Sequence, residues 1–395
     1  MDLKKTSTRN SNTILVISNI MNGYQMSRAK ISELTGLNKA TISEIVRNLI
    51  EDQYVVEIGA GESSSAGGRK PIYLEINKKA GISFSIDLRS DQISSLATYL
   101  NGEVIEKYTE HCKISKENVI ERLVNHVQEF NTKYTAKPFG MIGIAISIHG
   151  VVDENQISFT PYFDIDEIDL VKELEDRLNI PVYIENEANL SALAEAAYDH
   201  EHTHLISFSV HTGIGAGIIL DRQLFRGFKG RSGEIGHTIL YPDGIQCACG
   251  NKGCFEQYGS FTSLIRRFQT LKKDDQCTFD DLIEAVEQED AETTLLIDHF
   301  AKDLSIGLMN IMGTYDPEVI YVNSEIFDKL PNILSIIEKH LDRSIYKSIQ
   351  LSKSKLGSQS SLYGATVLNL KNFLSLDEVK FDIGYTSTAA VRSNK

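Results

Sequence analysis

Four residues in the second half of the chain have the types and spacing of a metal site. His237, Cys247, Cys249 and Cys254 follow the pattern H-x9-C-x-C-x4-C. Three thiolates and one imidazole give Zn²⁺ a closed tetrahedral shell, so such an ion shapes a loop and has no open position for catalysis. Glycines between the ligands permit the tight turns that this spacing needs. A disulfide or simple burial of the cysteines is the alternative, and the Cys₃His pattern favours structural zinc over both.

Composition narrows the class of protein. The two remaining cysteines, Cys112 and Cys277, are isolated, and residues 1–20 are too polar for a signal peptide. The sequence therefore predicts a reducing, cytoplasmic location. No apolar run approaches the roughly 18 residues that span a bilayer, so a membrane role is not expected. With 395 residues, 42% of them hydrophobic, the chain has the length of two or three domains.

Charge is unevenly distributed along the chain. The formal net charge is -14, which by itself argues against binding to nucleic acid. Residues 1–50, however, contain seven Lys or Arg and three Asp or Glu, and seven minus three gives +4. A basic N-terminal segment on an acidic body is typical of a DNA-binding module joined to a domain that does not bind DNA.

The basic segment has the signals of a helix-turn-helix. Apolar residues at helical spacing over residues 14–20 predict a first helix, and Ser27 can cap a second one. Gly36 suits the left-handed residue that ends that helix. Asn38 can then cap a third helix over residues 39–52.

A DNA-contacting surface is expected on the third helix and on a hairpin that follows it. Residues 54–76 read as two strands around a Gly/Ser-rich tip, that is, a wing, and Arg69 near its end suits a minor groove. Short polar and basic side chains near the start of the third helix suit base edges and phosphates. The predicted DNA-binding residues are Arg28, Asn38, Lys39, Thr41, Ser43, Arg47, Arg69 and Lys70. The alternative is a helical hairpin used for packing, but the order of caps, turn, basic face and wing favours DNA binding.

These motifs carry a family resemblance. In GGRKPIYLEIN, IENEANLSALAEA, HTGIGAGIIL, GEIGH and CACGNKGCFE the chain resembles the ROK family of repressors and sugar kinases, and its xylose-repressor branch in particular. The resemblance implies an α/β fold with a winged helix-turn-helix over residues 1–77. A two-lobed actin/hexokinase-like domain with a structural zinc loop is then expected over residues 80–395, with sugar bound between its lobes.

The pattern of residues agrees with an α/β body. Alternating or continuous apolar runs predict strands, and longer periodic segments predict helices. The expected strands are 82–88, 93–99, 103–108, 142–148, 181–184, 206–210 and 214–220, and the expected helices are 190–198, 300–313 and 364–373.

The resemblance also implies a sugar site. Sugar recognition needs hydrogen-bonding side chains that match neighbouring hydroxyls, and the residues at the matching family positions are Asn186, Glu187, Glu234, His237 and Glu256. His237 would serve both the metal and the pocket, so loss of the metal should disturb sugar binding. A loop over residues 149–163 takes the place of a further sugar-contacting loop, although it matches the family less well.

Three departures from the kinases of the family predict that the chain is not an enzyme. Where kinases have the phosphate-binding turn D-x-G-G-T, this chain has Asp87-Leu88-Arg89-Ser90-Asp91, without the glycines that admit a phosphate. A nucleoside-contacting Gly-Gly pair is replaced by Asn323-Ser324, and the catalytic Asp by Glu187, which is longer by one methylene. The glycine motif at 212–217 is kept, and we interpret it as a structural turn.

The sequence thus predicts a repressor that responds to a sugar. Two heads of a homodimer, or of a dimer of dimers, would bind a palindromic operator, and sugar that closes the lobes would release it. Xylose is the expected sugar from the family branch alone. The alternatives are an active cytoplasmic, ATP-dependent sugar kinase and a repressor controlled by a partner protein.

Overall fold

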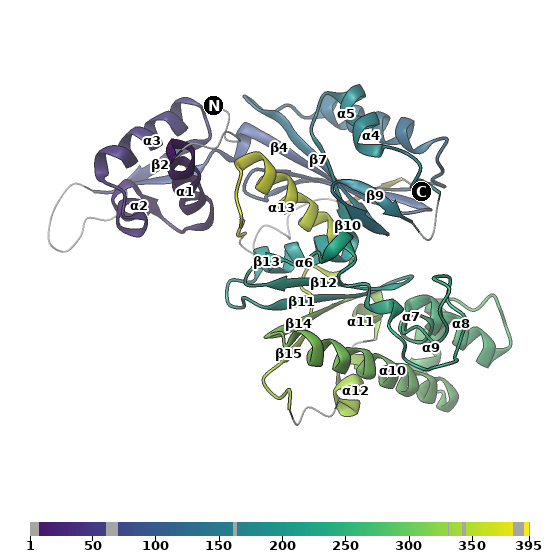
Figure 1. The fold of residues 1–395 in the computed structure, drawn as a ribbon. Coiled ribbons are helices and arrows are strands. Elements are labelled where there is room, and N and C mark those ends of the chain that lie inside the picture. The colour runs from purple at the N-terminus through teal and green to yellow at the C-terminus, as the bar shows by residue number, and fades with distance from the viewer. Residues whose placement is uncertain are drawn as a thin grey trace. The chain divides into compact units, whose positions relative to one another are not determined.

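The chain forms two compact units. The computed structural model describes residues 8–60, 70–160, 164–330, 332–341, 345–381 and 391–394, and Figure 1 shows the elements. Unit 1 comprises Met1–Asn186, Ala197–His200 and Leu362–Lys395, and unit 2 comprises Glu187–Ala196 and Glu201–Ser361. Among the described residues, we find no helix with the length and apolar character needed to cross a membrane.

The first elements of unit 1 are three helices and a small antiparallel sheet. The helices are α1 (Thr8–Asn22), α2 (Arg28–Thr35) and α3 (Lys39–Glu51). The sheet has the order β1-β3-β2, with β1 (Met26–Ser27), β2 (Val55–Ala60) and β3 (Ile72–Ile76). Strand β1 was not predicted, because two residues are too few to show an alternating pattern.

Local capping interactions set the ends of α2 and α3 where the sequence predicts them. Ser27 and Asn38 each accept a hydrogen bond from the backbone three residues later, at 3.3 and 2.9 Å. Gly36 ends α2 in the left-handed conformation, with φ 71°. The apolar face of α3 is buried as expected, and it consists of Ile42, Ile45, Val46 and Leu49.

A six-stranded sheet forms the body of unit 1. Its order is β10-β7-β4-β5-β6-β16. The strands are β4 (Gly81–Leu88), β5 (Gln92–Tyr99), β6 (Val104–His111), β7 (Gly140–Ile148), β10 (Val182–Asn186) and β16 (Val391–Asn394). Strands β10, β7 and β4 run parallel, so their carboxyl ends share one edge of the sheet. A two-stranded ribbon of β8 (Val151–Asp153) and β9 (Gln156–Phe159) follows β7.

The two faces of strand β4 differ in chemistry. Its even-numbered residues, among them Phe84 and Ile86, pack in an apolar cluster with α4 (Val119–Lys133) and α5 (Leu170–Leu178). The odd-numbered residues Ser83 and Ser85 are buried too, and they form hydrogen bonds with helix α13 (Ser360–Leu374). Strand β4 is therefore buried on both faces, one apolar and one polar.

Unit 2 is built on a five-stranded sheet of order β13-β12-β11-β14-β15. The strands are β11 (Leu205–Val210), β12 (Ile214–Leu220), β13 (Gln223–Leu224), β14 (Val319–Asn323) and β15 (Gln350–Lys353). The helices are α7 (Glu256–Gly259), α8 (Phe261–Lys272), α9 (Phe279–Glu287), α10 (Ala291–Tyr315), α11 (Glu325–Lys329) and α12 (Ile333–His340). Phe208, Phe255 and Phe300 are among the largest fully buried side chains of its core.

Helix α6 (Glu187–Tyr198) begins three residues earlier than predicted. It starts directly at the end of β10, without a loop, so that Asn186 closes the strand and Glu187 opens the helix. The predicted start at residue 190 was wrong, because no capping residue separates the strand from the helix.

Close packing of α6 on β12 leads to a prediction about Gly217. A Cβ atom there would lie 2.0 Å from the Ala188 carbonyl oxygen, whereas at Gly215 the nearest atom would be the Ala188 Cβ at 3.2 Å. We expect Gly217→Ala to lower the free energy of unfolding by about 3 kcal/mol and Gly215→Ala by clearly less. Urea unfolding of both variants measures this, and equal losses would contradict the packing described.

Candidate functional site

The predicted metal ligands lie together in a loop of unit 2. A single turn, Ile235–His237, carries the imidazole, and the three thiols follow in a segment closed by isolated bridges between Ile239 and Cys254 and between Gln246 and Lys252. Gly253 has φ 79°, and a Cβ there would lie 1.7 Å from a backbone oxygen. Glycine is therefore required at this position for the loop to close.

The geometry of the four ligand atoms fits one tetrahedral ion. All four lie within 4.8 Å of one another. The Sγ atoms of Cys249 and Cys254 are 3.6 Å apart, and the Cys247 Sγ is 3.7 Å from the His237 Nδ1. Metal–sulfur bonds of about 2.3 Å at a tetrahedral angle place two sulfurs about 3.8 Å apart, close to what is observed. The cluster can therefore hold a metal ion through Nδ1 and three thiolates.

Two carboxylates lie beside this cluster. The His237 Nε2, on the opposite side of the ring from Nδ1, is 4.0 Å from Glu234 Oε2. Glu256 is the first residue of α7 and lies two residues after Cys254, the last ligand. Its Oε2 accepts a long hydrogen bond of 3.4 Å from the Ile214 N–H. Burial raises the pKa of Glu234 and of Glu256. Three of the predicted sugar-binding residues, Glu234, His237 and Glu256, are thus brought together.

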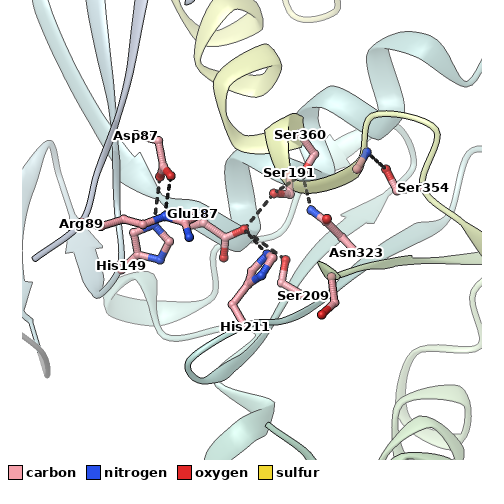
Figure 2. A network of polar contacts seen from close by, with 12 residues as sticks. Asp87, Arg89, His149, Glu187, Ser191, Ser209, His211, Asn323, Ser354 and Ser360 are labelled. Carbon is pink, nitrogen blue, oxygen red and sulfur yellow. Dashed lines mark hydrogen bonds and ion pairs between the residues drawn. The ribbon is translucent and has the colours of Figure 1, made fainter. Parts of the chain in front are cut away.

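Glu187, a fourth predicted residue, is buried in unit 2 and held by hydroxyls. Glu187 is the first residue of α6. Its Oε1 accepts hydrogen bonds from Ser191 Oγ at 3.1 Å and Ser209 Oγ at 3.2 Å (Figure 2). His211 Nε2 lies 3.9 Å from the same oxygen. These three partners were not predicted. Ser191 follows Glu187 by four residues, the spacing of helix neighbours, and this was the one available signal in the sequence.

The hydroxyl contacts continue away from Glu187 within unit 2. Ser360 Oγ donates to Ser191 Oγ at 2.8 Å, and Asn323 Nδ2 donates to Ser360 Oγ (Figure 2). Ser324 is also engaged, because it caps α11. The side chains of Asn323 and Ser324, the pair predicted to replace two glycines of the kinases, thus form hydrogen bonds within unit 2.

A separate charged cluster lies at the carboxyl ends of β4 and β7 in unit 1. Asp87 is 3% exposed, and its two oxygens contact Arg89 Nε at 2.8 Å and His149 Nε2 at 2.9 Å (Figure 2). Burial alone would raise the pKa of Asp87, but the charges and hydrogen bonds of His149 and Arg89 outweigh it and hold that pKa well below its usual range.

Asn186, the fifth predicted sugar residue, donates to the Gly150 oxygen at 2.8 Å.

Acid should destabilise the fold through Asp87. Because its pKa is lower in the folded chain than in the unfolded chain, where it is about 3.9, the cluster stabilises the fold above that pH. This contribution is lost as the pH falls below about 4 toward the folded pKa. We expect Asp87→Asn to be less stable than the wild type at neutral pH and to lose less stability on acidification. Urea unfolding at about pH 6 and about pH 3 tests this, with the exposed Asp91→Asn as control. Identical acid dependence of Asp87→Asn and the wild type would contradict the account.

The predicted DNA-binding residues fall into two groups. Lys39, Ser43 and Arg47 are exposed on α3, although Ser43 Oγ donates to the Lys39 oxygen at 2.8 Å, and Lys70 is exposed before β3. Others interact within the chain: Arg28 forms an ion pair with Glu57 at 2.8 Å and is half-buried, as is Thr41, and Asn38 caps α3. Arg69 lies outside the described residues, as do residues 161–163 of the loop predicted to contact sugar.

Comparison with known proteins identifies the class. The profile of the ROK family matches residues 83–372. The chain therefore belongs to the ROK family.

Two known proteins are similar to almost the whole chain, and a third is similar to about three quarters of it. It is 36% identical to the "Xylose repressor" of Bacillus spizizenii over 94% of this chain and 98% of that protein. Among solved structures it is similar to a ROK family transcriptional regulator, a homologue of the E. coli MLC protein, with a TM-score of 0.78, 26% identity and coverage of 92% and 96%. A ROK family glucokinase from Streptomyces griseus shares the fold over 73% of this chain and 99% of its own, with a TM-score of 0.65 and 24% identity.

Proposed function

We propose that this protein is a transcriptional repressor that binds operator DNA and leaves it when a sugar, xylose, binds. The observation that carries the proposal is the similarity to a named xylose repressor over 94% of the chain, which is too much of it to leave out α2, α3 or the carboxylate site. Sugar kinases of the same fold match only 73% of it.

Residues 1–77 are proposed to form a winged helix-turn-helix, and residues 80–395 the sugar-binding domain. The caps of α2 and α3 and the antiparallel pair β2–β3 support the first part. Helix α3 would enter the major groove with Lys39, Ser43 and Arg47. Contacts to the DNA phosphates or to an adjacent groove would come from Arg28, Asn38, Thr41, Arg69 and Lys70. Two such heads are needed for two half-sites, which supports a homodimer.

Sugar is proposed to be recognised by the five residues Asn186, Glu187, Glu234, His237 and Glu256. Ser191 and Ser209 both donate to Oε1 of Glu187, so that Oε2 is the oxygen that would accept a hydrogen bond from a sugar hydroxyl. Zn²⁺ is the proposed metal, because a closed Cys₃His set is typical of structural zinc. Its role would be to hold the imidazole of His237 in place between the metal and Glu234.

We propose that the protein does not transfer phosphate. Arg89 takes the place of a glycine in the phosphate-binding turn and forms an ion pair with Asp87, and Asn323 takes the place of a glycine after β14. A side chain at either position prevents the close backbone approach that phosphate binding by N–H groups requires.

A calorimetric titration with xylose, paired with an assay of ADP formation, tests this reading of the site. We expect saturable binding of xylose that does not need ATP, and no ADP formed from ATP with xylose or glucose. Sugar-dependent ADP formation would instead support the kinase alternative.

A further inference from the structure

Helix α13 is a continuous helix of 15 residues that belongs to both units. Ser360 and Ser361, at its start, are part of unit 2, and the residues from Leu362 onward are part of unit 1. The start of the helix contacts Ser191, a partner of Glu187, and its last turn contacts Tyr54, which is hydrogen-bonded to the end of α3.

The first residue of α13 is tied to the carboxylate of Glu187. Ser360 is fully buried and donates to Ser191 Oγ at 2.8 Å, and Ser191 donates to Glu187 Oε1 at 3.1 Å. Asn323 donates to Ser360 as well, so that the hydroxyl has directional partners on both sides (Figure 2). Because buried hydrogen bonds tolerate little displacement, a change in the position of Glu187 alters the restraint on the start of α13.

The middle of α13 is fixed to the central sheet of unit 1 by polar contacts. Thr366 Oγ1 and Ser85 Oγ are 3.0 Å apart, and Asn369 Nδ2 donates to Ser83 Oγ at 2.9 Å and to the Phe84 oxygen at 3.0 Å. These bonds have a defined direction and length. A shift of the helix along the sheet would have to break these bonds, which favours a step between discrete positions over continuous sliding.

The last turn of α13 packs against Tyr54, which lies three residues beyond the end of the proposed recognition helix α3. The rings of Phe373, Tyr54 and Phe139 form a cluster with centroid distances of 5.7 Å (Tyr54–Phe373), 4.6 Å (Tyr54–Phe139) and 5.1 Å (Phe139–Phe373). Tyr54 is 7% exposed, and its N–H donates to the Leu49 oxygen in the last turn of α3 at 2.9 Å. A shift of Phe373 is thus transmitted to α3 through a buried ring and a backbone hydrogen bond.

A second contact joins the N-terminal helices to the chain just beyond α13. The side-chain amide of Asn22, the last residue of α1, donates to the Glu378 oxygen at 3.1 Å and accepts from the Lys380 N–H at 2.9 Å. The Asn22 amide thus satisfies both the Glu378 carbonyl and the Lys380 N–H, as a neighbouring backbone strand would. The segment after α13 therefore moves with α1.

We propose that α13 is the element that couples the sugar site to the DNA-binding helices, with Ser191 and Ser360 as positioning residues at one end and the Tyr54–Phe139–Phe373 cluster as the contact at the other. This inference rests on the proposed function. Xylose at Glu187 favours one position of α13, operator DNA favours the other, and each ligand thereby lowers the affinity for the other.

The test is the ratio of operator dissociation constants with and without saturating xylose, measured for the wild type and variants. A typical coupling gives a wild-type ratio of about 10 to 100. We expect Ser360→Ala and Phe373→Leu each to reduce it to within about threefold of one, while the operator affinity without xylose changes little. Ser361→Ala is the matched control, because Ser361 is the next residue of the same helix, is also buried and takes no part in the hydrogen bonds that connect Ser360, Ser191 and Glu187.

The double variant shows whether the two substitutions interrupt the same coupling between sugar and DNA binding or two independent ones. If both substitutions interrupt the same helix, Ser360→Ala combined with Phe373→Leu reduces the ratio no further than the more damaging single variant. Thermal unfolding and a xylose titration show that each variant is folded and binds sugar. A full wild-type ratio in both folded single variants overturns the role of α13. Where each single variant keeps part of the ratio, an additive loss in the double variant overturns it as well. A wild-type protein whose operator binding ignores xylose would instead contradict the proposed function itself.

Discussion

A Cys254→Ser variant is expected to lose its metal and, with it, its affinity for xylose. Cys254 is fully buried, its Sγ lies 3.6 Å from that of Cys249, and its backbone bridges Ile239. Serine has nearly the same size but does not supply a thiolate, so a three-ligand site with a misplaced imidazole results. Two or three hydrogen bonds to sugar through Glu234, His237 and Glu256 would be lost or weakened. At about 1.5 kcal/mol for each bond to a charged group, xylose affinity falls at least about 100-fold.

Metal analysis and calorimetry of the same preparations measure this. We expect about one zinc per wild-type chain and almost none in the variant. Cys277→Ser is the matched control, because Cys277 lies outside the cluster and should keep both metal and xylose. Wild-type protein purified without zinc, or normal xylose binding by Cys254→Ser, would contradict the proposed link between the loop and the sugar site.

The second large effect is expected on operator binding when the exposed cations of α3 are removed. Lys39 and Arg47 are both exposed on this helix, and Arg47 is only loosely paired, with its Nε 3.9 Å from Glu51. Two lost contacts at about 1 to 3 kcal/mol each reduce specific affinity by about 30-fold or more in Lys39→Ala/Arg47→Ala. If both side chains contact phosphates, the slope of log affinity against log salt becomes shallower by about 1.8.

Xylose binding by this double variant should be unchanged, because α3 is far along the chain from every proposed sugar residue and binds none of them. Arg266→Ala/Lys302→Ala is the control, since it removes the same charge from exposed positions of unit 2. If the control lowered operator affinity as much, non-specific electrostatics and not α3 would be responsible for DNA binding.

Features set by neighbours in the sequence could be predicted from it. The ends of α2 and α3 depend on Ser27, Gly36 and Asn38, whose effects reach only a few residues. The four metal ligands lie between residues 237 and 254, and chain connectivity alone brings them close together. The even-numbered apolar residues of β4 likewise show the alternation that strands require.

Contacts between distant residues could not be predicted in this way. His149 and Asp87 are 62 positions apart, and Ser360 and Ser191 are 169 apart. No local pattern indicates that a buried serine forms a hydrogen bond with a serine far away in the sequence. The pairing of His149 with Asp87 follows only once β4 and β7 are known to be parallel neighbours. The sequence therefore indicated the carboxylate of Glu187 but not the groups that position it.

The central claim, that one chain joins operator binding to sugar binding, is tested most directly by fluorescence anisotropy on DNA from upstream of its own gene. The salt concentration is held fixed, since affinity for DNA depends steeply on it. We expect tight binding that xylose weakens by about tenfold or more and that glucose, fructose and N-acetylglucosamine at the same concentration do not reproduce. No specific binding, or specific binding that none of the sugars changes, would contradict the account.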